Sequence, residues 1–136
     1  VVLDAAGYRL GLTICYDVRF PGLLRHLAQA GAEVITVPSA FTVPTGEAHW
    51  HVLLRARAIE TGSFVLAAAQ AGHHESGRET YGHSLAVAPW GEVLAEAGQD
   101  PCAVVVDLYL AQVTAARRRI PALSHDRPFS LENLKR

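Results

Sequence analysis

The sequence predicts a mixed α/β fold of the α+β kind, in which strands and helices are stacked in layers as a sandwich. Short runs of β-forming residues alternate along the chain with longer stretches whose apolar residues recur at helical spacing. Half of the 136 residues are hydrophobic and 18% are charged, which is typical of a folded globular chain. A chain of this length fits one domain with a sizeable core.

The beginning of the chain is expected to contain three strands and one helix. Residues 1–4 have the composition of a strand, and residues 9–15 alternate apolar and polar side chains as a half-buried strand does. Pro21 then begins a helix that ends at Gly31. Its apolar face consists of Leu23, Leu24, Leu27 and Ala28. Residues 33–38 form a strand whose continuous apolar character indicates burial on both faces.

A second helix is expected after a loop at residues 39–46. Thr45 is its predicted N-cap, and Glu47 lies in the first turn, where the helix dipole favours an acidic side chain. Gly62 ends this helix, and residues 64–70 form the next strand. Apolar residues recur at helical spacing as Trp50, Leu53, Leu54 and Ala58.

The remainder of the chain is expected to form a hairpin, a last strand and a helix. Three glycines make residues 71–82 a predicted loop. Residues 83–88 and 92–97 flank a Pro-Trp-Gly turn and form the hairpin. Residues 102–108 form the last strand, and residues 109–119 form a helix with three arginines in its final turn.

The charge balance indicates no attraction to polyanions. Twelve basic and 13 acidic residues give a formal charge of −1, so no strong field draws the chain to nucleic acid or to an anionic membrane. All the basic residues but one are arginine. The exception, Lys135, lies in a polar tail that begins at Ser124 and is expected to be extended.

Cysteine usage and the absence of targeting segments bear on location. Two cysteines, Cys15 and Cys102, are too few for a disulfide framework, which predicts a reducing, cytoplasmic setting. No apolar run approaches the ~20 residues that span a bilayer, and no basic and apolar leader begins the chain. The chain lacks methionine and begins within a predicted strand, so we expect further residues upstream in the parent protein.

Cys15 is the candidate nucleophile. It lies at the predicted end of a strand, where the chain turns towards the helix at Pro21. A side chain at such a turn is exposed at the sheet edge, and the backbone N–H groups beyond it point towards the reacting atom. A free thiol is mostly protonated at neutral pH and needs a base or a cation nearby. The alternative is a small buried hydrophobic side chain, which a lone cysteine at a strand end more often is.

The residues around Cys15 form an extended motif. Residues 12–21 read LTICYDVRFP, and further matching segments follow in order at 32–35, 38–41, 45–50, 53–60, 67–70, 81–84, 89–91, 118–121 and 125–128. This combination, which covers nearly the whole chain, resembles the nitrilase superfamily of carbon–nitrogen hydrolases in its amidase branch. The loop at residues 73–75 makes it most similar to the group of deaminated glutathione amidases and omega-amidases.

The resemblance implies that residues 1–136 are the C-terminal part of a single carbon–nitrogen hydrolase domain, half or most of a four-layer α-β-β-α sandwich. It implies that Cys15 attacks the amide carbonyl of a small molecule bearing a carboxylate, that ammonia leaves, and that water hydrolyses the thioester. A glutamate acts as general base, and a lysine stabilises the oxyanion together with the backbone N–H of Tyr16. No cofactor is implied.

The sequence departs from the family pattern, in which the glutamate and the lysine precede the cysteine. Only 14 residues precede Cys15, Asp4 is the one acid among them, and Lys135 lies near the other end. We therefore expect this chain to be inactive alone. The alternative is a non-catalytic remnant that acts as an oligomerising or regulatory module. A third possibility is a Cys–His hydrolase that pairs Cys15 with His83 or His49.

Arg19, Phe41 and Thr42 are the candidate substrate-binding residues. Arg19, four residues after Cys15, can receive a substrate carboxylate in a bidentate pair, or form a structural ion pair with Asp17 or another acid. Phe41 and Thr42 follow the strand at 33–38 and share the sheet edge of the nucleophile if the strands are parallel. Ordinary loop packing is the alternative for both.

No metal site is predicted. His73 and His74 are adjacent, and His49 and His51 are two residues apart on the helix, so neither pair shares a face. Glu47 could replace the missing base, but its place at the helix start explains it without catalysis.

A half-sandwich is expected to leave one face of its sheet bare, which predicts a homo-oligomer (a dimer or higher), a complementing chain, or an N-terminal half present in the parent molecule. Apolar burial contributes about 25 cal/mol per Å², so a bare face is a serious loss of stability. The residues expected on that face are Val34, Ile35, Val65, Leu66, Val104 and Val105.

Overall fold

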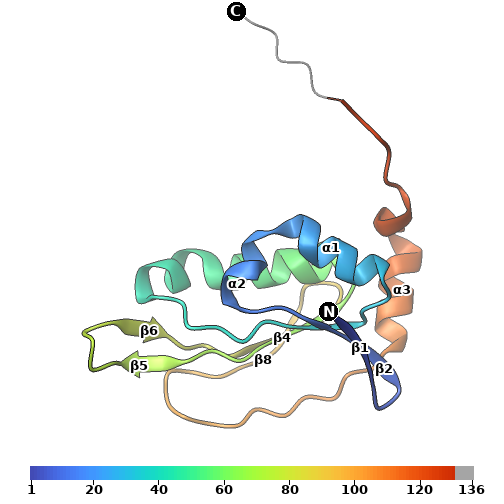
Figure 1. Ribbon diagram of the computed structural model, residues 1–136. Coiled ribbons are helices and arrows are strands. Elements are labelled where there is room, and N and C mark those ends of the chain that lie inside the picture. Colours follow the sequence, from blue (N-terminus) through green and yellow to red (C-terminus); the bar gives the residue numbers. More distant parts are fainter. Residues whose placement is uncertain (131–136) are drawn as a thin grey trace, which may run out of the picture.

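Six strands form one mixed sheet in the order β1-β2-β3-β4-β7-β8, and two more form a separate hairpin, β5-β6 (Figure 1). The structure, a computed structural model, describes residues 1–130; Lys135 and the end of the predicted tail lie outside the described residues. The strands are β1 Val2–Ala5, β2 Tyr8–Leu12, β3 Val34–Thr36, β4 Phe64–Ala67, β5 Ala71–His73, β6 Glu79–Tyr81, β7 Leu85–Val87 and β8 Val93–Glu96. The helices are η1 Cys15–Arg19, α1 Pro21–Gln29, α2 Val43–Thr61, α3 Ala111–Arg119 and η2 Ala122–Ser124.

The central strands β2, β3 and β4 run parallel, and the helices that connect them lie on one face of the sheet (Figure 1). Ile35 of β3 pairs in register with Val65 of β4, and both side chains are fully buried in the core that α1 and α2 cover. Other members of this core are Val18, Leu24, Leu27, Trp50, Leu54, Ala58 and Val87. The predicted mixed α/β class is therefore confirmed.

The helix α1 begins and ends where the sequence predicts. Pro21 is its first residue, and Gly31 follows its end with a φ of 98°, which glycine adopts without strain. Leu24 and Leu27 are buried in the core, as expected. Leu23 is exposed instead, since it lies one position away from the stripe that faces the sheet.

The helix α2 begins earlier than predicted. Its first residue is Val43, with Thr42 as N-cap and Pro44 in the first turn. The Thr45 hydroxyl donates to the Thr42 carbonyl at 3.1 Å, so Thr45 lies inside the helix rather than before it. The end at Gly62 is confirmed, with a left-handed φ of 58°. Neither α2 nor any other helix in residues 1–130 has both the length and the apolar character needed to cross a bilayer.

The predicted loop at residues 71–82 is in fact the hairpin of β5 and β6. Ala71 pairs with Tyr81 and Gly72 pairs with Thr80 in an antiparallel ladder. Polar side chains and glycines concealed this ladder because they lack the alternation on which strand prediction depends. The hairpin lies beside the start of α2, where the ring of Tyr81 lies against Gly46.

The second face of the sheet differs from the expectation in two ways. Residues 102–108 form no strand; they cross beneath the sheet, with Val105 91% exposed (Figure 1). Successive strand residues also point to opposite faces, so Ile35 and Val65 face the helices. On the second face Val34 is buried with Phe64 and with Val113 of α3.

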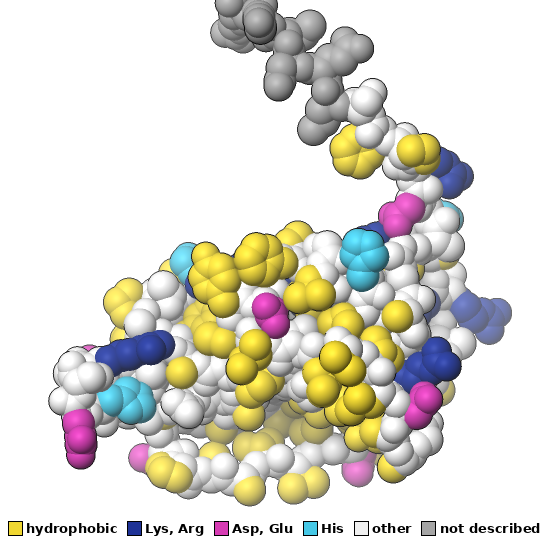
Figure 2. Space-filling view, in the orientation of Figure 1, with side chains coloured by type: hydrophobic (Ala, Val, Ile, Leu, Met, Phe, Trp, Pro, Cys, Tyr) yellow, Lys and Arg dark blue, Asp and Glu magenta, His cyan; other side chains and the backbone are white. Residues whose placement is uncertain are grey.

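A hollow remains on this second face. It has a volume of about 600 Å³ and lies between the sheet and the crossing segment. Hydrophobic side chains are visible on both of its walls (Figure 2). Its lining includes Leu66, Ala86, Ala95, Val104 and Val105. Of the residues expected on a bare face, Val34, Ile35 and Val65 are buried and Leu66 is half-buried. The exposed ones, Val104 and Val105, lie on the crossing segment rather than on the sheet.

Arg117 connects α3 by hydrogen bonds to residues that lie just before β3 and β4. Its guanidinium donates to the carbonyls of Thr61 and Ala32, at 3.1 and 2.6 Å, and to the Ser63 hydroxyl at 2.9 Å. Burial lowers the pKa of Arg117, and the negative charge of Glu33 opposes that shift. The charge is therefore held at a partly buried position by three acceptors.

Replacing Gly46 by alanine should destabilise the fold by about 3 kcal/mol, because the new Cβ would overpack this contact. That Cβ would lie 2.1 Å from Cγ of Tyr81. The free energy of unfolding is measured by urea titration. The matched control is Gly22→Ala in α1, where a Cβ meets nothing within 4 Å; it should be neutral or stabilising by up to about 1 kcal/mol. Equal stability of Gly46→Ala and the wild type would contradict the close contact.

Candidate active site

Cys15 lies beyond the carboxyl end of β2, at the edge of the sheet. The strand ends at Leu12, three residues earlier than predicted, and Cys15 begins the short helix η1. Its φ is 45°, a left-handed conformation that is uncommon for a side chain other than glycine. The Cys15 backbone N–H donates to the Pro38 carbonyl at 2.8 Å, which holds the turn against the end of β3.

A pocket of about 480 Å³ opens beside Cys15. Its lining comes from the segments that follow β2, β3 and β4 and from the residue before β7. It consists of Ile14, Cys15, Pro38, Ser39, Ala40, Ala68, Ala69, Gln70 and Ser84. Cys15 is half-buried and borders this open space. The thiol is therefore not sealed in the apolar interior.

Hydrogen bonds fix the polar side chains of the wall. The Ser84 hydroxyl accepts from the Ala69 backbone N–H at 2.9 Å, and the buried Ser39 hydroxyl donates to the Val37 carbonyl at 3.1 Å. Apart from Cys15, none of the described lining residues carries an ionisable side chain. The pocket thus presents a thiol without a carboxylate, lysine or histidine in its wall.

The turn after Cys15 is held by Asp17. The Asp17 carboxylate accepts from the Ile14 backbone N–H, and the Asp17 N–H donates to the Ile14 carbonyl, both at 2.9 Å. The backbone N–H of Tyr16 takes part in no hydrogen bond within residues 1–130. The Tyr16 side chain is exposed. The N–H next to the nucleophile therefore remains free to donate.

Arg19 lies among aromatic rings. Its guanidinium carbon is 5.6 Å from the ring centre of Tyr16 and 5.0 Å from that of Phe41. Both terminal nitrogens lie 3.4 Å from Nδ1 of His49. The alternative, a structural ion pair with Asp17 or another acid, is not formed: no carboxylate in the described residues pairs with Arg19. Its charge is therefore available to another anion.

Phe41 and Thr42 connect this region to α2 and β6. Phe41 is buried against Trp50, with ring centres 4.9 Å apart. Thr42 forms an isolated bridge to Thr80 of β6 and caps α2. Neither Phe41 nor Thr42 lines the pocket beside the thiol, and Arg19 does not line it either. The structure thus places the three candidates next to the pocket rather than in its wall.

The Cys–His alternative finds no support in the geometry. No histidine of residues 1–130 lines the pocket. The imidazole of His49 contacts Arg19, and that of His83 is bound to Glu96. Glu47 is exposed, beyond the first turn of α2.

Sequence reasoning missed Ser39, Ser84 and Gln70 as parts of the wall. The first and last of these follow β3 and β4, whose parallel direction brings their carboxyl ends to the edge that holds Cys15. The strand assignments therefore contained a usable signal for them. Ser84 precedes β7, which pairs antiparallel with β4, and only that pairing brings it to the site.

Comparison with known proteins decides the family. Residues 1–118 match the family described as carbon-nitrogen hydrolase, and this match covers most of the chain. The chain belongs to the carbon–nitrogen hydrolase family. The match falls on the N-terminal part of this chain and not on its C-terminal residues. The expected hydrolase domain of residues 1–136 is therefore shown over residues 1–118, and its place in the C-terminal half of a hydrolase stays a prediction.

The relatives of this carbon–nitrogen hydrolase chain include enzymes and solved structures. It is 54% identical over 129 residues to the deaminated glutathione amidase of Homo sapiens, covering 93% of this chain and 38% of that protein. It is 36% identical to the crystal structure of Saccharomyces cerevisiae Nit3, a member of branch 10 of the nitrilase superfamily. That comparison has a TM-score of 0.87 and covers 95% of this chain and 47% of that one. The chain thus spans less than half the length of either relative.

A third relative carries a covalent adduct. A mutant of the amidase from Nesterenkonia sp. AN1 holds the acetamide moiety of fluoroacetamide on its active-site cysteine. The chain is 38% identical to it, with a TM-score of 0.74, and the match covers 88% of this chain and 44% of that one. The hydrolase family therefore includes a solved amidase whose cysteine reacts with a small amide.

Glycine at position 15 should make the chain more stable than alanine does, by about 1 kcal/mol, because glycine adopts a left-handed φ without strain. Urea unfolding of Cys15→Gly and Cys15→Ala measures the difference. The exposed position 48 in α2 is the control, and there Ala48→Gly should cost about 1 kcal/mol. If alanine is the better residue at both positions, the left-handed turn at Cys15 is wrong.

Proposed function

We propose that this chain provides the nucleophile of an amidase that hydrolyses a small, carboxylate-bearing amide. The observation that carries the proposal is the position of Cys15, half-buried in a left-handed turn that borders an open pocket. The names of the relatives favour a deaminated glutathione type of substrate. Both cysteines are free thiols, which is consistent with the proposed cytoplasmic setting.

In the proposed reaction the Cys15 sulfur, as thiolate, attacks the amide carbonyl carbon. The carbonyl oxygen becomes an oxyanion, which the free backbone N–H of Tyr16 is suited to stabilise. The C–N bond then breaks, and the nitrogen takes up a proton and leaves as ammonia. Water attacks the thioester, which releases the carboxylic acid and restores the thiol.

Arg19 is the proposed anchor for the substrate carboxylate. Its guanidinium has no acidic partner in the described residues, and a charged hydrogen-bonded pair would satisfy it. The ring of Phe41 supports the guanidinium by a cation–π contact, and Thr42 fixes the loop that carries Phe41. Such an anchor would orient the amide end of the substrate towards the thiol.

The chain by itself is proposed to lack turnover of amides. The pocket wall offers no group that could protonate the departing nitrogen or deprotonate water. The glutamate and the lysine that the resemblance implies have no counterpart in it. This same observation favours the second candidate function, a module without catalytic activity that assembles with other copies or regulates a partner.

Activated esters separate these two candidates. A 4-nitrophenyl ester of a short dicarboxylic acid needs no acid to expel its leaving group, so Cys15 should become acylated once and then remain acylated. Intact mass and the single burst of nitrophenolate measure this. Cys102→Ala should be acylated like the wild type, and Cys15→Ala should not. Arg19→Gln should acylate about 10-fold more slowly, because a hydrogen bond to a charged group contributes about 1.5–3 kcal/mol.

Equal acylation of the Cys15→Ala variant and the wild type would refute the nucleophile. The matching test uses an ω-amide of the same dicarboxylic acid and records ammonia. Ammonia release that depends on Cys15 would show that this chain needs no further base, which contradicts the proposed inactivity.

We also propose a homo-oligomer, because apolar side chains remain exposed around the hollow on the second sheet face. Val104 and Val105 are 46% and 91% exposed there. Sedimentation velocity should give a mass of at least twice the 14.6 kDa of one chain. Val105→Lys should shift the distribution towards monomer, since a charge on an apolar interface is costly. A wild type that is monomeric at high concentration would exclude the oligomer.

A further inference from the structure

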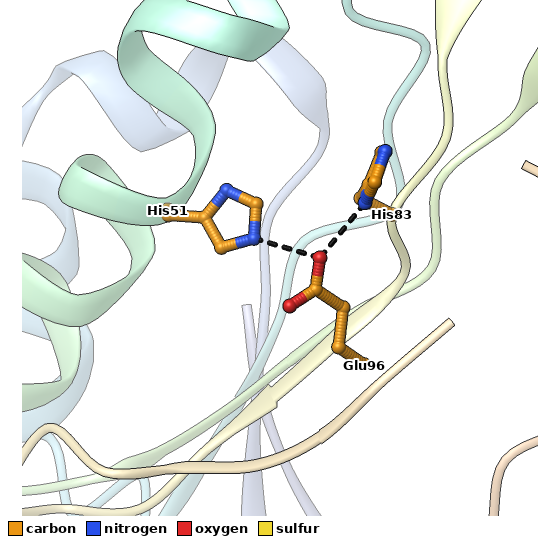
Figure 3. Close-up of side chains that lie close together, drawn as sticks. All are labelled: His51, His83 and Glu96. Carbon is orange, nitrogen blue, oxygen red and sulfur yellow. Dashed lines mark hydrogen bonds and ion pairs between the residues drawn. The ribbon is translucent and has the colours of Figure 1, made fainter. Parts of the chain in front are cut away.

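Two histidines and one glutamate from three distant segments meet away from Cys15. His51 lies on α2, His83 precedes β7, and Glu96 ends β8 (Figure 3). Nε2 of His51 and Nδ1 of His83 lie 3.0 and 2.8 Å from the same oxygen of Glu96. One potential ligand atom from each residue lies within 4.8 Å of the other two. None of the three residues lines the pocket beside the thiol.

The backbone fixes His83 before any ligand binds. Its carbonyl accepts from the Trp50 indole N–H at 2.7 Å, and its N–H donates to the Gly98 carbonyl at 3.1 Å. Its φ is 59°, an uncommon value for histidine, and its ring stacks on Tyr81 with ring centres 4.2 Å apart. The imidazole is therefore held in one direction at a cost in backbone energy, as is common at functional positions.

We propose that His51, His83 and Glu96 bind a divalent transition-metal ion such as Zn²⁺. Two imidazole nitrogens and one carboxylate oxygen form a donor set that suits zinc and its neighbours better than Mg²⁺ or Ca²⁺, which prefer oxygen ligands. Tetrahedral zinc with bonds of about 2.0–2.2 Å keeps its ligand atoms about 3.4 Å apart. The two distances to Glu96 are slightly shorter, so a small separation of the side chains admits the ion.

Metal binding would replace the hydrogen bonds between the three side chains. Nε2 of His51 and Nδ1 of His83, which face one oxygen of Glu96, would bind the ion through their lone pairs. Each histidine binds a metal as the neutral tautomer whose other nitrogen carries the proton. Those other nitrogens, Nδ1 of His51 and Nε2 of His83, have no hydrogen-bond partner in residues 1–130 and can face solvent.

The three side chains are partly open to water, being 32%, 26% and 38% exposed in the order His51, His83, Glu96. An ion can therefore enter, and a water molecule can occupy a fourth position. Bound metal would add a further link between α2 and the β7–β8 edge of the sheet, which already share hydrogen bonds and the buried core. A ligand that binds only the folded chain stabilises it by a free energy that grows with the logarithm of the ratio of ligand concentration to Kd.

Zinc titration of the metal-free chain tests the proposal, with calorimetry for binding and thermal unfolding for stability. The wild type should bind one ion per chain, and its unfolding midpoint should rise with zinc and fall back with a chelator. His51→Ala and Glu96→Gln should each weaken binding by more than about 100-fold, because even the loss of an outer partner of a ligand costs about 10–100-fold.

Two matched variants separate this site from other sources of zinc binding. His49→Ala, two residues away on the same helix, should bind like the wild type. Cys15→Ala should also bind like the wild type, which excludes the thiol as ligand. Visible absorption of the Co²⁺-loaded chain reports on the ligands without depending on stability. Zinc binding that survives His51→Ala, that vanishes in Cys15→Ala, or that is absent from a folded wild type would overturn the proposal.

Discussion

The parallel hydrogen-bond ladder of β2, β3 and β4 is the constraint on which the rest of the molecule depends. The ladder does not stop where the strands end. The backbone N–H of Cys15 donates to the Pro38 carbonyl, and that of Ser39 donates to the Ala68 carbonyl, both at 2.8 Å. These bonds continue the sheet into its loops and hold three chain segments at one edge. The helices α1 and α2 pack on one face of these strands, and the side chains buried there keep the strands in register.

The elements with regular patterns could be predicted from the sequence. The apolar run at β3 and the proline and glycine at the ends of α1 carry local signals that tertiary contacts do not override. The β5-β6 hairpin could not be predicted, because its pairing is maintained by backbone bonds and by contact with α2 rather than by apolar alternation. Residues 102–108 have the composition of a strand, yet no neighbouring strand within residues 1–130 pairs with them.

The candidate site, too, could be predicted only where its residues are neighbours along the chain. Cys15 and the surrounding motif were evident from the sequence, because the nucleophile and its turn are neighbours along the chain. Ser84 and the cluster of His51, His83 and Glu96 depend on the antiparallel pairing of β7 with β4 and β8. Consideration of histidine pairs close in sequence did not reveal this cluster, because each of its histidines finds its partner in another element. Local spacing contains no information on such contacts.

The contact between Tyr81 and Gly46 determines how the region around the pocket can move. Because position 46 has no side chain, the ring of Tyr81 packs directly on the helix backbone, and the β5-β6 hairpin lies against the first turns of α2. Gln70, which borders the pocket, immediately precedes that hairpin. Any outward movement of the hairpin would therefore separate the Tyr81 ring from the helix and expose both to water, at the cost of this apolar contact.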